Sequence, residues 1–162
     1  MKVPMKWLKE YVDIHMPAEE YAGRMVMTGT AVESVDRTGE QFDKVVVGYV
    51  VSCVDHPNSD HLHICMVDVG EAEPIQIICG APNVRAGMRV AAALDGARLP
   101  GAGGSGPVKI KKGKMRGEVS CGMLCSGPEL DVPAGLYPHI GDAGIIEIFE
   151  DVEPGTDVKQ VF

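Results

Sequence analysis

Aromatic residues are scarce in this sequence of 162 residues, which has three Phe, four Tyr and one Trp. Single-strand-binding proteins stack successive bases on aromatic side chains. So few aromatic residues argue against a rich stacking surface of that kind. Long apolar runs are also missing: none approaches the roughly 20 residues of a membrane-spanning helix. The opening MKVPMKWLKE has no signal-peptide apolar core. We therefore expect a cytoplasmic chain without membrane contact.

The chain has few positive charges: it contains 15 Lys and Arg and 23 Asp and Glu, which gives a formal net charge of -8. A phosphate-binding domain normally carries a basic field. Nucleic-acid binding would therefore have to depend on a local concentration of cations.

The five cysteines are an odd number and follow no export signal, so a disulfide framework is not expected. We predict reduced and mostly buried thiols. The cysteines are Cys53, Cys65, Cys79, Cys121 and Cys125.

Apolar residues at helical spacing predict a first helix around Trp7, Leu8 and Tyr11 within residues 1–39. Pro17 opens a second helical segment, and Gly29 stands where a helix end favours a positive φ. A brief extended run follows at residues 31–35.

From Val45 the pattern changes to β-branched runs separated by turn residues, with predicted strands at 45–54, 62–69, 75–78 and 89–94. A Gly-rich loop, a basic strand and a final strand in the tail complete the series. Closely spaced strands without helical crossovers favour an antiparallel barrel. About 110 residues suit one five-stranded OB-type β-barrel, so the expected fold class is mainly β with α.

Two motifs give weak indications of a binding site, one for a dinucleotide and one for zinc. Gly101, Gly103 and Gly106 match G-x-G-x-x-G, but Pro107 and the run after it do not open the helix that a dinucleotide site requires. Histidines and cysteines suggest a zinc site, yet Cys121 and Cys125 lack a second matching pair. The candidate ligands are His56, His61, His63, Cys65, Cys79, Cys121 and Cys125. We expect no zinc.

Catalytic arrangements are equally poorly supported. Neither Ser105 nor Ser126 lies in a nucleophile elbow. Cys125 with His139 remains open as a nucleophile–base pair. Asp55 and Asp60 flank a turn, where Asp caps backbone amides.

The strongest positive signal is a run of five cations in eight residues without an acid among them. These are Lys109, Lys111, Lys112, Lys114 and Arg116. Strand alternation places Lys109 and Lys111 on one face, with the others opposite or beyond a bend at Gly113. Without these five, 10 basic residues remain against 23 acidic ones, so charge is segregated. The pattern suits phosphate contact with a folded RNA; a solvated edge strand is the alternative.

Several strings together resemble a known family. MKVPMKWLKEYVDI resembles the start of bacterial phenylalanyl-tRNA synthetase β subunits. HPNSDHLHICMVDVG, IICGAPNVRAGMRVAAALDGARLP and IKKGKMRGEVSCGMLCS resemble the tRNA-binding OB domain that those subunits share with methionyl-tRNA synthetase extensions and free-standing tRNA-binding proteins.

The resemblance implies a barrel inserted into a small split α+β domain. Residues 1–39 would form its helical part, 40–151 the tRNA-binding barrel, and 152–162 the start of a return segment packing with 1–39. It also implies a tRNA-binding face. The residues of that face are Asn58, Asp60, Asn83, Arg85, Ser120, Met123 and Ser126, beside Lys109, Lys111, Lys112, Lys114 and Arg116. Ser59 and His61 replace the family's usual Ala and Lys, which removes a fixed positive charge.

The resemblance further implies that the parent enzyme attaches phenylalanine to its tRNA with ATP and magnesium, bound elsewhere in an α2β2 assembly with the α subunit. A chain of 162 residues cannot hold those sites, so we expect a non-catalytic module without cofactor that captures and positions tRNA. Two alternatives stay open. One is a structural module docking on neighbouring domains or subunits, and the other is a small hydrolase using Cys125 or Ser126.

Overall fold

The computed structural model describes residues 3–36, 41–101, 106–132 and 144–161. Gly103, Ser105 and His139, which entered the motifs above, lie outside the described residues. Contacts divide the chain into two compact units, Met1–Arg37 and Thr38–Phe162, and each is described by itself.

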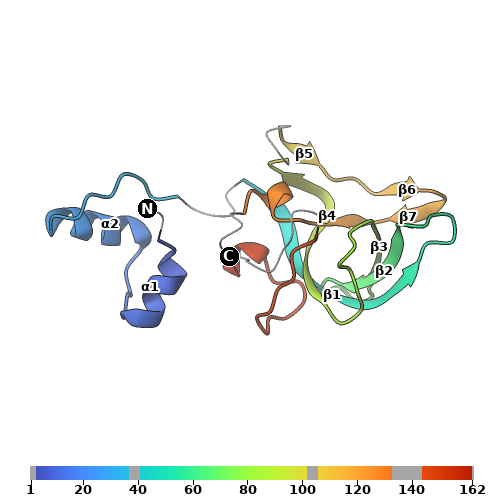
Figure 1. Ribbon diagram of the computed structural model, residues 1–162, viewed down its shortest axis with the longest axis horizontal. Helices are drawn as coiled ribbons and strands as arrows, with labels where there is room; N and C mark the ends of the chain where they lie inside the picture. Colours follow the sequence, from blue (N-terminus) through green and yellow to red (C-terminus); the bar gives the residue numbers. More distant parts are fainter. Residues whose placement is uncertain (1–2, 37–40, 102–105, 133–143, 162) are drawn as a thin grey trace. The chain divides into compact units, whose positions relative to one another are not determined.

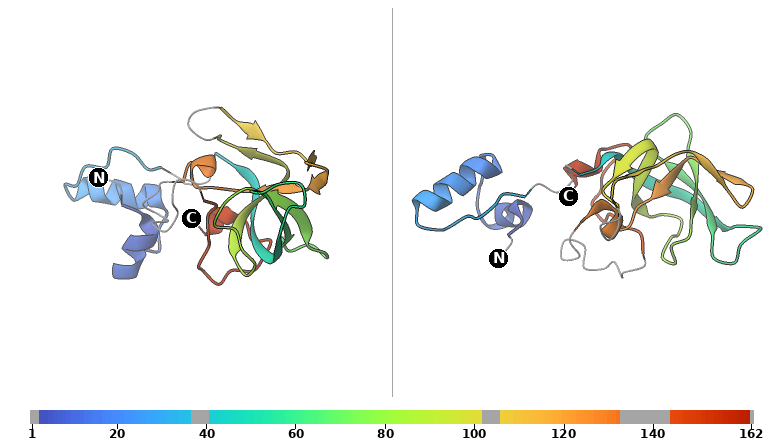
Figure 2. Two further views of the ribbon diagram at one scale, coloured as in Figure 1. Left: turned by 45° about the vertical axis from the view of Figure 1, so that its right-hand side comes forward. Right: turned by 90° about the horizontal axis from the view of Figure 1, so that it is seen from above.

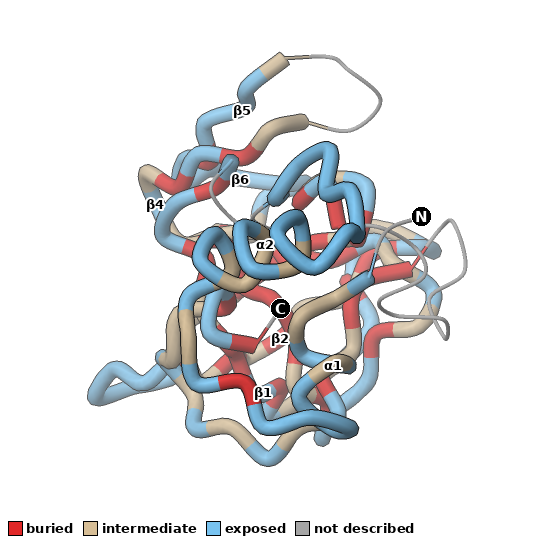
Figure 3. Tube along the Cα trace, turned by 90° about the vertical axis from the view of Figure 1, so that its left-hand side faces the viewer, coloured by how far each residue is buried: buried red, intermediate tan, exposed pale blue. Residues whose placement is uncertain are grey.

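Among its described residues, the first unit contains the helices α1 (Met5–Tyr11) and α2 (Ala18–Met27). Pro17 immediately precedes α2, and Glu19 and Glu20 in its first turn complement the positive end of the helix dipole. Gly29 follows with a φ of 91°, the left-handed conformation expected at a helix end. Neither helix contains a buried residue, as the pale blue and tan tube of Figure 3 shows.

The second unit is built mainly of strands (Figure 1). They are β1 (Asp43–Asp55), β2 (His63–Asp68), β3 (Ile75–Cys79), β4 (Arg89–Leu99), β5 (Val108–Lys109), β6 (Gly113–Met115), β7 (Glu118–Ser120) and β8 (Gly122–Leu124). Among the described residues, the short 3-10 helices η2 (Pro128–Leu130) and η3 (Val158–Gln160) accompany them. The predicted fold class, mainly β with α, is confirmed.

The main sheet has the strand order β3-β2-β1-β4-β5, and β8 also pairs with β4. The segment β7–β8 spans the remaining gap between β4 and β3. Ala92 and Leu124 are paired on the β4 side, and Cys121 donates its amide to the carbonyl of Gln76 at 2.8 Å on the β3 side. The result is a nearly closed five-stranded antiparallel barrel, which the views of Figure 2 show from two sides, and it confirms the OB-type prediction.

The barrel has one apolar cluster inside and a second outside. Val90 and Ala92 of β4 point into the barrel with Cys65 and Val67, while Ala91 and Ala93 belong to the outer cluster. Segment 144–161 covers this outer face, and Ile148 donates its amide to the carbonyl of Arg89 at 2.8 Å. Both faces of β4 are therefore buried, which explains its run of small apolar residues.

Three strand predictions were wrong in extent. The strand predicted at 89–94 continues to Leu99, because Asp43 of β1 and Lys109 of β5 both pair with Arg98. The basic strand is interrupted: β5 ends at Lys109 and pairs with β4, whereas β6 starts at Gly113 and pairs with β7. In the tail, Ile145 and Glu147 form isolated bridges with Ser126 and Val90 instead of a final strand.

Val152 and Val161 of the predicted return segment pack in the outer apolar cluster of the second unit. The expected packing of 152–162 with 1–39 stays a prediction. No helix among the described residues is long and apolar enough to cross a membrane.

Candidate nucleic-acid interface

The basic segment, residues 109–116, follows the outside of the barrel from β5 to the tip of the hairpin that β6 and β7 form. Ile110 anchors it: this side chain is buried, its amide donates to the Ala97 carbonyl at 2.8 Å, and its carbonyl accepts from the Gly96 amide at 2.9 Å. Lys109 and Lys111 on either side are exposed, in agreement with the predicted alternation. The amide of Lys112 donates to Oδ1 of Asp95 at 2.7 Å. The backbone is thus fixed to β4, and the lysine side chains face solvent.

Arg98 belongs beside this segment, although the sequence did not indicate it. It is exposed and lies directly opposite Lys109 in the pairing of β4 with β5. Like charges at opposed positions of a sheet are unfavourable by themselves. Asp43 of β1 is the register partner of Arg98 on its other side. Arg98 was missed because the predicted strand stopped at Leu94, and only the register brings Arg98 to Lys109.

The turn between β1 and β2 contacts the hairpin at Met115 and Arg116. In Figure 1 this turn and the β6–β7 hairpin lie at the same end of the barrel. Nδ2 of Asn58 donates to the carbonyl of Arg116 at 3.4 Å, and Nη1 of Arg116 donates to the carbonyl of Asn58 at 3.5 Å. Nε2 of His56 lies 3.3 Å from the carbonyl oxygen of Met115. Asn58, Lys114 and Arg116, all predicted site residues, are therefore brought to one end of the barrel. Asp60, another of them, is exposed in the same turn.

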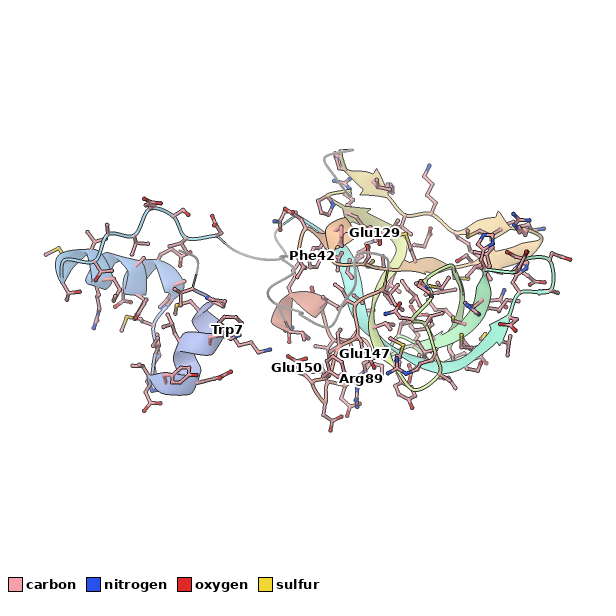
Figure 4. The ribbon with its side chains drawn as sticks, in the orientation of Figure 1. Trp7, Phe42, Arg89, Glu129, Glu147 and Glu150 are labelled. Atoms are coloured by element: carbon pink, nitrogen blue, oxygen red, sulfur yellow. The ribbon has the colours of Figure 1, made fainter. Side chains whose placement is uncertain are left out.

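Asn83 and Arg85 lie in a different environment. The side-chain amide of Asn83 makes two hydrogen bonds with the backbone of Ile145, and Nη2 of Arg85 forms a 2.6 Å ion pair with Glu147. Figure 4, in the orientation of Figure 1, shows Glu147 well away from the hairpin. The structure does not bring these two residues to the basic segment.

Ser120, Met123 and Ser126 also have contacts within the barrel. The buried hydroxyl of Ser120 accepts from the Ile78 amide at 3.0 Å and donates to the Gly122 carbonyl at 2.9 Å. Met123 packs against the outer apolar cluster. The hydroxyl of Ser126 donates to Oε2 of Glu129 at 2.7 Å. These side chains hold the closing segment in place and present little to a ligand.

The cysteines are free thiols, and Cys65, Cys79 and Cys125 are buried. The burial of these three agrees with the prediction of mostly buried thiols. Burial raises the pKa of the Cys65 and Cys125 thiols well above their ordinary range, which disfavours the nucleophilic thiolate. Within the described residues, no group of three or more His, Cys, Asp or Glu side chains is arranged to hold a metal ion.

The class of protein is now defined: an OB-type barrel with an exposed basic segment next to the turn between its first two strands. Residues 45–157 match the family model described as "Putative tRNA binding domain", and the chain belongs to that family.

Relatives cover nearly the whole chain. It is 48% identical over 160 residues to the phenylalanine–tRNA ligase β subunit of Latilactobacillus sakei and 49% identical over 158 residues to that of Streptococcus mutans. The matches cover 99% and 98% of this chain, and they confirm the resemblance to these β subunits. The chain spans 19% of the length of each relative.

Among solved structures, a methionyl-tRNA synthetase related protein from Pyrococcus horikoshii aligns with a TM-score of 0.46 at 20% identity. The alignment covers 69% of this chain and 85% of that one, and the fold assignment above does not depend on it.

Proposed function

We propose that this chain is the tRNA-contacting module of a phenylalanine–tRNA ligase β subunit, and that it captures tRNA phosphates through the basic segment. The observation that carries the proposal is the exposure of all five cations of that segment in a chain of net charge -8. Among the described residues, none of the five forms an ion pair with a carboxylate, whereas Arg24, Arg85 and Arg89 do. Unpaired cations are available to phosphate.

The expected mechanism is electrostatic capture and orientation. Each phosphate that a cation neutralises releases condensed counterions, which favours binding without reading base identity. The acidic remainder of the chain repels RNA, so tRNA approaches with the basic segment first. Arg98 extends the segment onto β4. With few aromatic side chains, this chain contributes position and charge more than base stacking.

The same proposal places the module in a larger cytoplasmic enzyme. That enzyme would attach phenylalanine to tRNA with ATP and magnesium, in an α2β2 assembly with the α subunit and the rest of the β subunit. ATP and magnesium would bind outside this segment, which would itself be non-catalytic.

The test is binding of the purified chain to bulk tRNA at about 50 and 200 mM salt. A charge variant replaces Lys109, Lys111, Lys112 and Lys114 by alanine. A control variant removes four cations elsewhere, at Lys6, Lys9, Arg24 and Lys159, and changes the net charge equally.

We expect the logarithm of the affinity of the unaltered chain to fall linearly with the logarithm of the salt concentration, with a slope of about 0.7 to 0.9 per neutralised phosphate. The charge variant should lose most of the affinity and flatten the slope, while the control variant keeps both. Equal losses in the two variants would mean that net charge alone matters. Absence of binding even at low salt would favour the structural docking role that the acidic net charge allows.

A further inference from the structure

The β6–β7 hairpin is attached to the main sheet through β7, because Nε2 of Gln76 donates to the Val119 carbonyl at 2.8 Å and the Ile78 amide donates to Oγ of Ser120 at 3.0 Å. Strand β6 and the tip pair with β7 and lie on the far side of it from β3. The three residue pairs of the hairpin, from Gly113↔Ser120 to Met115↔Glu118, form a two-stranded sheet separate from the main one. All three residues of β6 are exposed. An isolated two-stranded hairpin is marginally stable in water. The direction in which Lys114 and Arg116 point therefore depends on what holds the tip of the hairpin.

His56 is unusual in the turn that meets this tip. It is 3% exposed, whereas Pro57 and Asn58 beside it are exposed. The backbone of His56 is held by two hydrogen bonds. Its amide donates to the Leu62 carbonyl at 2.9 Å, and its carbonyl accepts from the Ser59 amide at 3.2 Å. The burial of the imidazole and the two backbone hydrogen bonds restrict the orientations that the ring can adopt.

Both ring nitrogens of His56 have partners. Nδ1 accepts a hydrogen bond from the Asn58 amide at 3.1 Å, so this nitrogen carries no proton. The neutral ring then carries its proton on Nε2, which donates to the carbonyl of Met115 at 3.3 Å. One nitrogen holds the turn, and the other reaches the hairpin 59 residues further along the chain.

We propose that His56 is a positioning residue for RNA contact: it joins the β1–β2 turn to the β6–β7 hairpin and fixes the direction of Lys114 and Arg116. The two bonds between Asn58 and Arg116 are longer, at 3.4 and 3.5 Å, and both involve exposed side chains. The buried imidazole is the part of the contact that solvent does not reach. This role in binding depends on the proposed tRNA contact, while the hairpin docking itself does not.

Two substitutions separate the two functions of the ring. In His56→Asn, the shorter side chain still accepts from the amide two residues ahead, as Asn does in turns, but it cannot reach Met115. His56→Gln restores a donor at about the distance of Nε2.

The first measurement is hydrogen exchange of backbone amides 113–120 without RNA. We expect His56→Asn to speed their exchange at least about tenfold, with amides of β1 to β4 unchanged, and His56→Gln to restore part of the protection.

The second measurement is tRNA affinity at low salt. His56→Asn should weaken binding by about three- to tenfold. The same substitution should have no further effect when Lys114 and Arg116 are already alanine, because the hairpin then carries no cation to position. As a matched control, it should keep its full effect when Lys109 and Lys111 are alanine, since those cations lie outside the hairpin.

Unchanged exchange of residues 113–120 in His56→Asn overturns the proposal. So does a loss of affinity that simply adds to the loss from Lys114 and Arg116. If the unaltered chain does not bind tRNA, the proposed function fails, and the exchange comparison still decides whether His56 holds the hairpin.

Discussion

Asn83 and Ile145 are joined by two hydrogen bonds: Nδ2 of Asn83 donates to the Ile145 carbonyl at 2.9 Å, and the Ile145 amide donates to Oδ1 at 3.0 Å. The side chain thus pairs with backbone as another strand would. It connects the loop before β4 to segment 144–161, which covers the outer apolar cluster. A residue that the family resemblance assigned to RNA contact thus makes two hydrogen bonds within the protein.

Asn83→Ala should therefore lower the free energy of unfolding by about 1 to 3 kcal/mol, because it leaves the amide and carbonyl of Ile145 without these partners. Urea denaturation measures the change. Glu71→Ala, at an exposed loop position, serves as the control and should stay within about 0.5 kcal/mol. A large loss of tRNA affinity at unchanged stability would instead indicate that Asn83 contacts RNA.

Gly155 and Gly87 form a matched pair for separating backbone strain from steric contact. Both have a φ of 88°, but an added Cβ at Gly155 would lie 2.9 Å from the Val69 carbonyl oxygen, and one at Gly87 meets nothing within 4 Å. Alanine should cost about 1 to 2 kcal/mol at either position through left-handed strain. At Gly155 the crowding of backbone against Val69 should add about 1 to 3 kcal/mol. Equal losses of unfolding free energy in the two variants, measured by thermal or urea unfolding, would show that segment 144–161 shifts at Gly155 with little cost.

Arg98→Ala is expected to weaken tRNA binding and to reduce the salt slope by about 1, the effect of losing one phosphate contact. Arg85→Ala removes the same charge from a residue already paired with Glu147, and its effect on the slope should be smaller. Titrations of both variants at several salt concentrations make the comparison. Equal slopes for the two variants would contradict the extension of the basic segment onto β4.

Stability should fall as pH rises above about 9, because burial raises the pKa of the Cys125 thiol above its ordinary value of 9.0. The unfolded chain loses this proton above pH 9 while the folded protein keeps it, so the stabilising effect is complete below 9 and declines above it. Each such thiol contributes up to about 1.4 kcal/mol per pH unit.

Cys125→Ser tests this contribution, since the hydroxyl does not titrate there. Urea unfolding of both proteins between about pH 8 and 10 gives the two slopes. The variant starts from a lower stability, and its free energy of unfolding should decline less steeply with pH. Parallel slopes would mean that the Cys125 thiol does not contribute to the alkaline loss of stability.

The sequence alone determined most of the helices and strands and the family. Strands β1, β2 and β3 were predicted close to their observed bounds, because β-branched runs end at turns such as HPNSD that local chemistry specifies. Pro17 and Gly29 marked the limits of α2 for the same local reason. The concentration of Lys109 to Arg116 was visible because those residues are neighbours in the chain.

Only the tertiary structure decided which residues meet across long separations. The pairing register places Arg98 opposite Lys109, barrel closure gives Ser120 its internal partners, and segment 144–161 buries the second face of β4. From the sequence, His56 was considered only as a zinc ligand, and that site was not expected. In the fold, its Nε2 lies at hydrogen-bond distance from the Met115 carbonyl. Such contacts depend on how the strands pair and how the barrel closes. The pattern of residues along the chain does not specify these.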